Sequence, residues 1–289
     1  MRGTAVGQRD RCDSCDLGSP PTLVPGSGPT GPFAPAARAR MPPWFPMNRL
    51  PEPPPSRSRD QPRGFTAEGS AVELVRSGHI REALYGRSVA ADGEVVLVPL
   101  KAFAEAKVRL APALTSLERS ELARSLAGAV IAAAAPLPVI VVCEDGEVAR
   151  WAASHGAMAA EEPGTGLNGA VQSVSWECAI AGYSRITVVH GDIPDPAGLS
   201  EAGGSYGESV AVLVPDRRRD GTNLVSLPAT AIRPPGEPSG FTFRYGPGSF
   251  ARHSAETVRL GLTTRILSDT GLSVDIDVPD DLSFVGWRR

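Results

Sequence analysis

Hydrophobic positions follow two different patterns along this chain, and the change comes near residue 90. From Glu94 onward, short runs that are apolar throughout alternate with longer segments in which apolar residues recur at helical spacing. Strands that are apolar on both faces, with helices between them, are typical of a mostly parallel sheet covered on both sides. The four strongest runs are EVVLVPL, PVIVVC, RITVVHGD and ESVAVLVPD. We therefore predict an α/β fold, with one Rossmann-like domain over residues 91–289 and a mixed, mostly parallel sheet.

The segments between these runs carry the signals of helix ends. Thr115 and Glu118 have the spacing of a capping box at the start of one helix. Gly156 and Gly182 stand where a glycine commonly ends a helix. A further helix is expected directly after the glycine-rich stretch RYGPGS.

Residues 1–90 have a different composition. Half of the 28 prolines lie before Arg63, and neither a strand period nor a helix period is visible there. Such a segment buries too little apolar surface to offset the entropy of ordering the chain, so we predict a disordered leader. A short amphipathic helix over Ala71–Leu84 is the one element that its pattern allows. A start of the native protein at Met41 or Met47 is an alternative account of this leader.

Charge and cysteine content exclude several classes of function. The net charge is -3, so the chain has no general attraction to nucleic acid or to anionic membranes. The most apolar stretch is broken by prolines, and no apolar run follows the basic N-terminus, so we expect a cytoplasmic protein. Cys12 and Cys15 form a C-x2-C pair, but a zinc site needs a second pair, and free thiols are expected.

Candidate ligand-binding residues follow the predicted strands, because ligands of open parallel sheets bind beyond the carboxyl ends of the strands. Lys101, Lys107 and Arg109 come after the first strand and suit a polyphosphate. Asn168 begins a helix within a glycine-rich stretch, where it serves either as a helix cap or as a contact for a base or ribose. The phosphate-loop and dinucleotide-binding motifs are absent, which argues against a P-loop kinase and a dinucleotide dehydrogenase.

Acidic residues stand at two of the predicted strand ends. Asp192 directly follows a buried strand in HGDIPDP. Asp275 and Asp277 are two apart on what we predict to be a short strand, so they face the same side. Asp280 and Asp281 then begin a last helix. Two acidic strand ends in one cleft favour a hard cation such as Mg²⁺ that bridges phosphates.

The stretch RYGPGSFARH has the features of an anion site. Its glycines expose backbone N–H groups, and a helix start leaves its first N–H groups without partners. Arg252 and His253 either support such a site or cover the helix surface. The turn DGTN follows a strand and faces the same edge, so it is either a structural turn or part of the site.

These motifs together resemble a known family. The segments VPLKAFAEAKVRLAP, GTGLNGAV, GDIP, DGTNLV, RYGPGSFARH and VDIDVPDDL occur in this order. From Glu94 to the C-terminus the chain is similar to the phosphoenolpyruvate or 2-phospho-L-lactate guanylyltransferases of coenzyme F420 biosynthesis. The resemblance implies a nucleotidyltransferase fold and transfer of GMP from GTP to a three-carbon phospho-acid, with release of diphosphate.

The resemblance also assigns roles to residues near the triphosphate. Asp192 and Asp277 would hold Mg²⁺. Lys101, Lys107 and Arg109 would contact the triphosphate and, with Asp192, form the catalytic set.

The remaining matched positions belong to the two substrates. Leu167 and Asn168 would lie near the guanosine. Thr222, Gly246 and Ser249 would hold the phospho-acid, chiefly its carboxylate, with the turn before the helix gripping it through N–H and hydroxyl donors.

Partners and alternatives follow from the same resemblance. Phosphoenolpyruvate is the favoured phospho-acid, and neither nucleic acid nor membrane is expected as a partner. The resemblance leaves open a homodimer and contact with the next enzyme of the pathway. The alternatives are a different Mg²⁺-dependent nucleotidyltransferase or glycosyltransferase on the same fold, and an inactive binding or scaffold protein.

Overall fold

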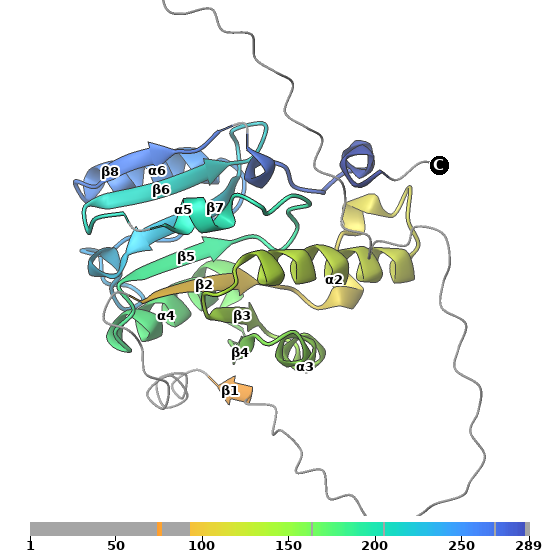
Figure 1. Ribbon diagram of the computed structural model, residues 1–289, viewed down its shortest axis with the longest axis horizontal. Coiled ribbons are helices and arrows are strands. Elements are labelled where there is room, and N and C mark those ends of the chain that lie inside the picture. The colour runs from red at the N-terminus through yellow and green to blue at the C-terminus, as the bar shows by residue number, and fades with distance from the viewer. Residues whose placement is uncertain (1–73, 77–92, 163, 205, 269, 287–289) are drawn as a thin grey trace, which may run out of the picture. The chain divides into compact units, whose positions relative to one another are not determined.

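The computed structural model describes residues 74–76, 93–162, 164–204, 206–268 and 270–286, all within the unit Ala67–Arg289. Their centre is an eight-stranded sheet with the strand order β1-β4-β3-β2-β5-β7-β6-β8 (Figure 1). The strands are β1 Leu74–Arg76, β2 Glu94–Pro99, β3 Val139–Cys143, β4 Met158–Glu161, β5 Arg185–Val189, β6 Val210–Pro215, β7 Thr222–Pro228 and β8 Thr263–Ile266.

In the described residues, five α-helices and several short 3-10 turns connect the strands. Thr115 forms the predicted capping box, accepting from the Glu118 amide while its own amide donates to the Glu118 carboxylate. The helices are α2 Ser116–Ala133, α3 Gly146–Ser154, α4 Gly166–Ile180, α5 Leu199–Gly203 and α6 Ser249–Arg259. The 3-10 turns are Phe103–Glu105, Val108–Leu110, Ala229–Ala231, Gly271–Ser273 and Pro279–Val285.

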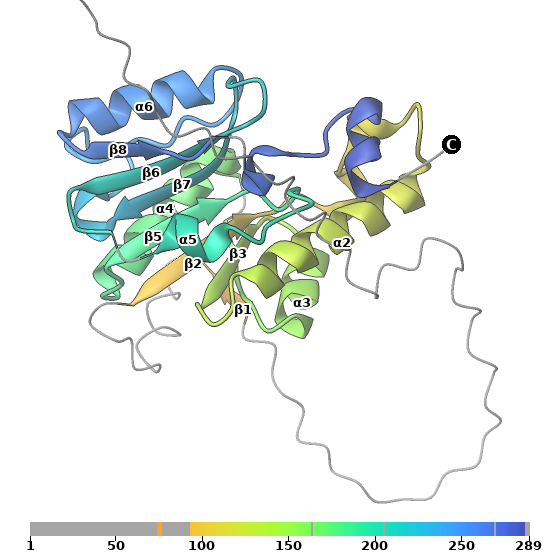
Figure 2. The same ribbon diagram turned by 45° about the horizontal axis from the view of Figure 1, so that its top comes forward.

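The sheet separates two apolar layers. Alternate residues of one strand enter opposite layers: Val95 and Leu97 pack with α4, whereas Val96 and Val98 pack with α2, α3 and α5. Helices α2, α3 and α5 therefore cover one face, and α4 and α6 cover the other (Figures 1 and 2). The predicted α/β fold with strands buried on both sides is confirmed.

The sheet is mixed because β7 runs antiparallel to both of its neighbours. β5 and β6 each pair with β7 antiparallel, while the other pairs in the sheet are parallel. The strand predicted at Asp275–Asp277 is wrong, since this segment lies between two 3-10 turns. Its amides donate to groups outside any strand: Ile276 to the Asp192 carbonyl, and Asp277 and Val278 to the Asp281 carboxylate.

Three residues of the predicted leader belong to the sheet. Leu74–Arg76 pairs parallel with β4, so neither disorder nor the allowed helix over Ala71–Leu84 holds at these positions. The physical reason is that β4 would otherwise present its unpaired backbone groups at the sheet edge. The remainder of residues 1–90, with Cys12 and Cys15, lies outside the described residues. Cys143 and Cys178 are buried free thiols.

A third apolar cluster fixes the C-terminal segment. It joins the 3-10 turn Val108–Leu110, helix α2 and the turn Pro279–Val285, which lie side by side in both views (Figures 1 and 2). Its buried members are Leu110, Leu114, Leu126, Ile276, Leu282 and Val285. Segments that are more than 160 residues apart in sequence thereby meet at the carboxyl end of the sheet, as the contact of Arg109 with Asp277 at a separation of 168 residues illustrates.

Candidate active site

Lys107 brings the two predicted metal-binding aspartates together. Its Nζ lies 2.6 Å from Oδ2 of Asp192 and 3.8 Å from Oδ1 of Asp277. Arg109 completes the group, with Nη1 2.7 Å from the other oxygen of Asp277. The Lys107 side chain is 9% exposed, whereas that of Arg109 is 74% exposed. Lys101 is exposed in the loop after β2 and takes no part in these ion pairs.

The backbone of Lys107 is itself unusual. Its φ of 55° and ψ of 36° lie in the left-handed region, which costs a non-glycine residue about 1–2 kcal/mol. Strain of this kind persists where the surroundings hold it, and it gathers at functional sites. Here the part-buried ion pair with Asp192 and the packing of Leu110 hold the turn.

The charge of Asp192 is stabilised by its neighbours. Burial raises the pKa of the carboxyl, but the Lys107 ammonium and the nearby His190 outweigh it and hold the pKa below its usual range. Burial, the largest influence, lowers the pKa of His190, while the charges of Asp192 and Asp277 act in the opposite direction. Oδ1 of Asp192 and Nε2 of His190 are both inaccessible and lack a hydrogen-bond partner within the described residues.

Asp277 is positioned by a second carboxylate that sequence reasoning missed. Asp281 is 4% exposed, accepts hydrogen bonds from the amides of Asp277 and Val278 at 2.9 and 2.8 Å, and pairs with Arg217. Asp281 stands at the start of the last turn, as predicted, but the turn is a 3-10 helix. No single-residue signal separates it from Asp280, because both suit the same helix start.

The acidic groups suit a divalent cation. Burial, followed by the charges of Asp192 and Asp277, raises the pKa of Asp275 to about 6. Mutual repulsion of this kind is relieved by a hard cation, which carboxylate oxygens bind well. Within the described ranges, no three His, Cys, Asp or Glu side chains form a complete metal site. Asp192 Oδ1 lacks a hydrogen-bond partner in the described residues, and together with Asp277 it offers the carboxylate oxygens that Mg²⁺ binds; two such ligands would leave further positions to other oxygens.

Asn168 lies at the start of α4 but is not its cap. Thr165 occupies the cap position. The Asn168 amide forms two bonds with the backbone of Tyr245: Oδ1 accepts from the amide at 2.6 Å, and Nδ2 donates to the carbonyl at 3.3 Å. Leu167 is 38% exposed beside it, so it presents an apolar surface while Asn168 holds the neighbouring chain.

Thr222 and Ser249 meet a histidine whose role the sequence left open. Ser249 Oγ donates to Thr222 Oγ1 at 3.2 Å, and His253 Nδ1 lies 3.0 Å from the same oxygen. All three residues are buried. His253 therefore supports the site and does not cover the helix surface. A histidine four residues after the first residue of a helix carries no signal of this role in the sequence.

The turn before α6 uses most of its amides within the protein. Gly246 and Gly248 have φ values of 118° and 71°, which glycine adopts without strain. The amides of Gly248 and Phe250 donate to Asp220, and that of Ser249 donates to the Gly246 carbonyl. The expected grip on an anion by the first N–H groups of this helix is therefore wrong for these three amides, and the hydroxyls of Thr222 and Ser249 remain as candidate donors.

The sequence of this chain is similar to those of known proteins. Residues 94–285 match the family model described as Guanylyl transferase CofC like. The phosphoenolpyruvate guanylyltransferase of Sphaerobacter thermophilus is 37% identical over 196 residues, which cover 65% of this chain and 90% of that protein. The 2-phospho-L-lactate guanylyltransferase of Methanothermobacter thermautotrophicus is 30% identical over 194 residues, covering 64% and 81% respectively.

A solved structure supports the fold alone. A protein of Desulfovibrio desulfuricans assigned to the nucleotide-diphospho-sugar transferases superimposes with a TM-score of 0.55 at 19% identity, over 66% of this chain and 85% of the other. In the part of the chain that the structure describes, none of the helices has the length and apolar character needed to cross a membrane.

Proposed function

The chain belongs to the family described as Guanylyl transferase CofC like, and from this premise we propose that it joins GMP from GTP to a three-carbon phospho-acid. In this reaction a phosphate oxygen of the phospho-acid attacks the α-phosphorus of GTP. The bond from that phosphorus to the bridging oxygen breaks, and diphosphate leaves. The product, an enolpyruvyl- or lactyl-2-diphospho-5'-guanosine, is the activated precursor for coenzyme F420.

The meeting of Asp192 and Asp277 around the Lys107 ammonium is the observation that carries this proposal. Phosphoryl transfer depends on positioning and on charge neutralisation more than on covalent help from the protein. Mg²⁺ held by these two carboxylates would neutralise charge on the triphosphate. Lys107, little exposed and held by its ion pairs, orients the phosphate oxygens, and the exposed Arg109 and Lys101 add charge from the rim.

The phospho-acid is assigned to the other side of the site. The hydroxyls of Thr222 and Ser249 supply neutral donors for its carboxylate, and the φ of Gly246 lets the backbone approach closely. Leu167 and Asn168 at the start of α4 are assigned to the guanosine. Four relatives named for phosphoenolpyruvate are 32–37% identical to this chain, which supports that phospho-acid over 2-phospho-L-lactate.

A turnover assay tests the proposal. The full chain is incubated with GTP, Mg²⁺ and either phospho-acid, diphosphate release is followed, and the product is identified by mass spectrometry. We expect diphosphate in equal amount to the guanylylated product, and none when Mg²⁺ is chelated or Asp192 is replaced by Asn. Turnover with a sugar phosphate but with neither phospho-acid would refute the assignment.

A further inference from the structure

A short extended segment, Thr242–Tyr245, connects the two halves of the site, and we call it the strap. Its four successive amides donate to side chains, alternately on α6 and α4. The bonds are Thr242 N to Glu256 Oε2 at 3.2 Å, Phe243 N to Gln172 Oε1 at 3.3 Å, Arg244 N to His253 Nε2 at 2.9 Å and Tyr245 N to Asn168 Oδ1 at 2.6 Å. Successive groups of an extended chain point to opposite sides, so the strap is held between the two helices.

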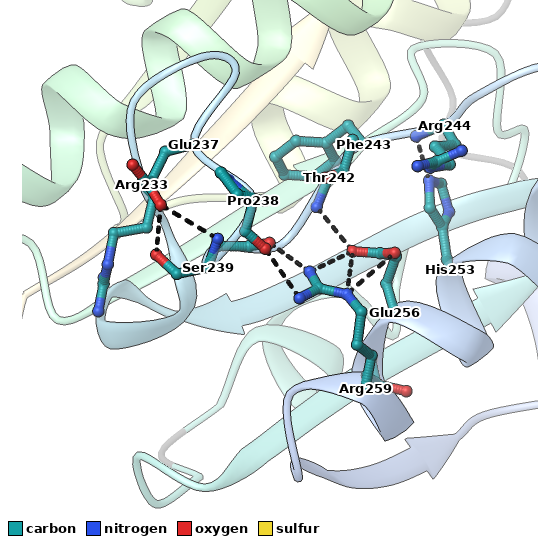
Figure 3. Close-up of polar contacts among 12 residues, drawn as sticks. Arg233, Glu237, Pro238, Ser239, Thr242, Phe243, Arg244, His253, Glu256 and Arg259 are labelled. Atoms are coloured by element: carbon teal, nitrogen blue, oxygen red, sulfur yellow. Dashed lines mark hydrogen bonds and ion pairs between the residues drawn. The ribbon is translucent and has the colours of Figure 1, made fainter.

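The α6 side of the strap is anchored at both ends (Figure 3). Arg259 donates to the carbonyls of Pro238 and Gly240 at 2.9 and 2.5 Å, and to Oε2 of Glu256 at 2.6 Å. Glu256 and His253 then receive alternate strap amides, as Figure 3 shows. The strap leads directly into the Gly246–Ser249 turn, so its position sets that of the proposed phospho-acid site.

The hydrogen bond from the strap to His253 determines which ring nitrogen carries the proton. Nε2 accepts from the Arg244 amide and therefore has no hydrogen. A neutral imidazole must then carry its hydrogen on Nδ1, which lies 3.0 Å from Oγ1 of Thr222 and donates to it. Burial, followed by the charges of His190 and Arg252, lowers the pKa of His253 to about 4, so the ring is neutral at pH 7.

This tautomer fixes the direction of the Thr222 hydroxyl. Oγ1 accepts from His253 Nδ1 and from Ser249 Oγ, so both of its lone pairs are used. Its own proton is left to donate to a further acceptor. Thr222 is 2% exposed, so its hydroxyl is shielded from water, and a hydrogen bond that it donates to a charge there is stronger than in water.

We propose that His253 is a positioning residue that forces Thr222 to donate, and thereby selects the carboxylate of the phospho-acid. The inference rests on the proposed function for the identity of the substrate, but the proton position on His253 does not. A carboxylate accepts without donating and fits this arrangement, whereas a group that only donates, such as an ammonium, would find no acceptor in Thr222. Because the Arg244 amide sets the tautomer of His253, the strap contributes to the selection of the carboxylate.

Two substitutions at one position separate this role from a structural one. The side chain of His253→Asn ends near the place of Nδ1, so it keeps a donor for Thr222 and loses the acceptor for the strap. That of His253→Gln ends near the place of Nε2, so it keeps the acceptor for Arg244 and loses the donor. We expect His253→Gln to raise the KM for the phospho-acid about ten- to a hundredfold with the KM for GTP within twofold, and His253→Asn to raise it less.

A larger rise of the phospho-acid KM in His253→Asn than in His253→Gln would show that His253 only supports the fold. Equal rises of the KM values for the phospho-acid and for GTP would show the same. Thr222→Val serves as the second variant, because it removes the hydroxyl at similar volume and keeps His253. It should raise the phospho-acid KM by the same factor, and adding His253→Gln to it should cause no further rise. If the two substitutions raised the KM independently, the proposal that His253 acts through Thr222 would be overturned.

Nitrogen-15 NMR of the full chain tests the tautomer without turnover. The chain has four histidines, so the signals missing from the His253→Gln spectrum assign this ring. At pH 7 we expect a proton on Nδ1 and none on Nε2. The reverse tautomer, or a charged ring, would sink the inference even in an active enzyme. If the tautomer is as expected but neither phospho-acid is guanylylated, the proposed function fails and the choice of a carboxylate fails with it.

Discussion

The neutral state of His253 makes the fold sensitive to mild acid. The pKa of this ring falls from 6.5 to about 4 on folding, chiefly through burial, with His190 and Arg252 acting in the same direction and Glu256 against them. Between these two pH values His253 is protonated in the unfolded chain and neutral in the folded chain. The stabilisation is therefore complete above pH 6.5 and is lost as the pH falls toward 4.

The magnitude follows from the same shift. Each pKa unit corresponds to about 1.4 kcal/mol, so His253 alone lowers the free energy of unfolding by about 2 kcal/mol between pH 7.5 and 5. Over the whole interval the loss is about 3 kcal/mol. That is a large fraction of the free energy of unfolding of a typical domain, which is roughly 5–15 kcal/mol.

Urea unfolding of the wild type and of His253→Gln at pH 7.5 and pH 5 measures the effect. The variant cannot titrate at this position and keeps an acceptor for the Arg244 amide. Other groups, such as Asp275 with its pKa raised to about 6, titrate in both proteins and cancel in the comparison. We expect the wild type to lose about 2 kcal/mol more than the variant on acidification.

An equal loss in the two proteins would refute the reasoning, because it would mean that His253 takes up its proton without cost. His155→Gln is the matched control, since it removes an exposed histidine directly after α3. This control should follow the wild type at both pH values.

Three further results are expected. Asp192→Asn removes the partner of Lys107 and a ligand of the proposed Mg²⁺ site, and should lower kcat/KM at least about a hundredfold in the diphosphate assay while the circular dichroism spectrum stays unchanged. Ser249→Ala should raise the KM for the phospho-acid about tenfold and leave that for GTP unchanged, and equal rises would contradict the placement of the carboxylate. Thr115→Ala removes the capping box of α2 and should lower the free energy of unfolding by about 1 kcal/mol, measured in urea, with unchanged kinetics.

The sequence predicted the parts of the fold that local pattern determines. The fully apolar runs became β2, β3, β5 and β6, and the capping box at Thr115 and the glycines Gly156 and Gly182 marked helix ends correctly. β7 and β8 were not identified, because TNLVSLP and TTRI mix polar and apolar residues and are strands only through their neighbours in the sheet.

The same distinction explains what was found of the site. Asp192 and Lys107 could be predicted because each follows a strand, and strand ends share one edge. The partners that position these groups could not, since Asp281 and Gln172 act on backbone amides of segments distant in sequence or without regular structure. Side chains that accept from such backbone amides do not recur at a regular spacing and form no sequence motif, so the sequence does not reveal them.

The C-terminal segment shows why such positioning needs the whole domain. Asp277 lies close to Lys107 because Ile276 and Leu282, on either side of it, are buried in the same cluster as Leu110. The Ile276 amide also donates to the carbonyl of Asp192, so one residue links both carboxylates through the backbone. Apolar burial thus supplies the free energy that holds two like charges near each other, and the cation between them makes the arrangement stable.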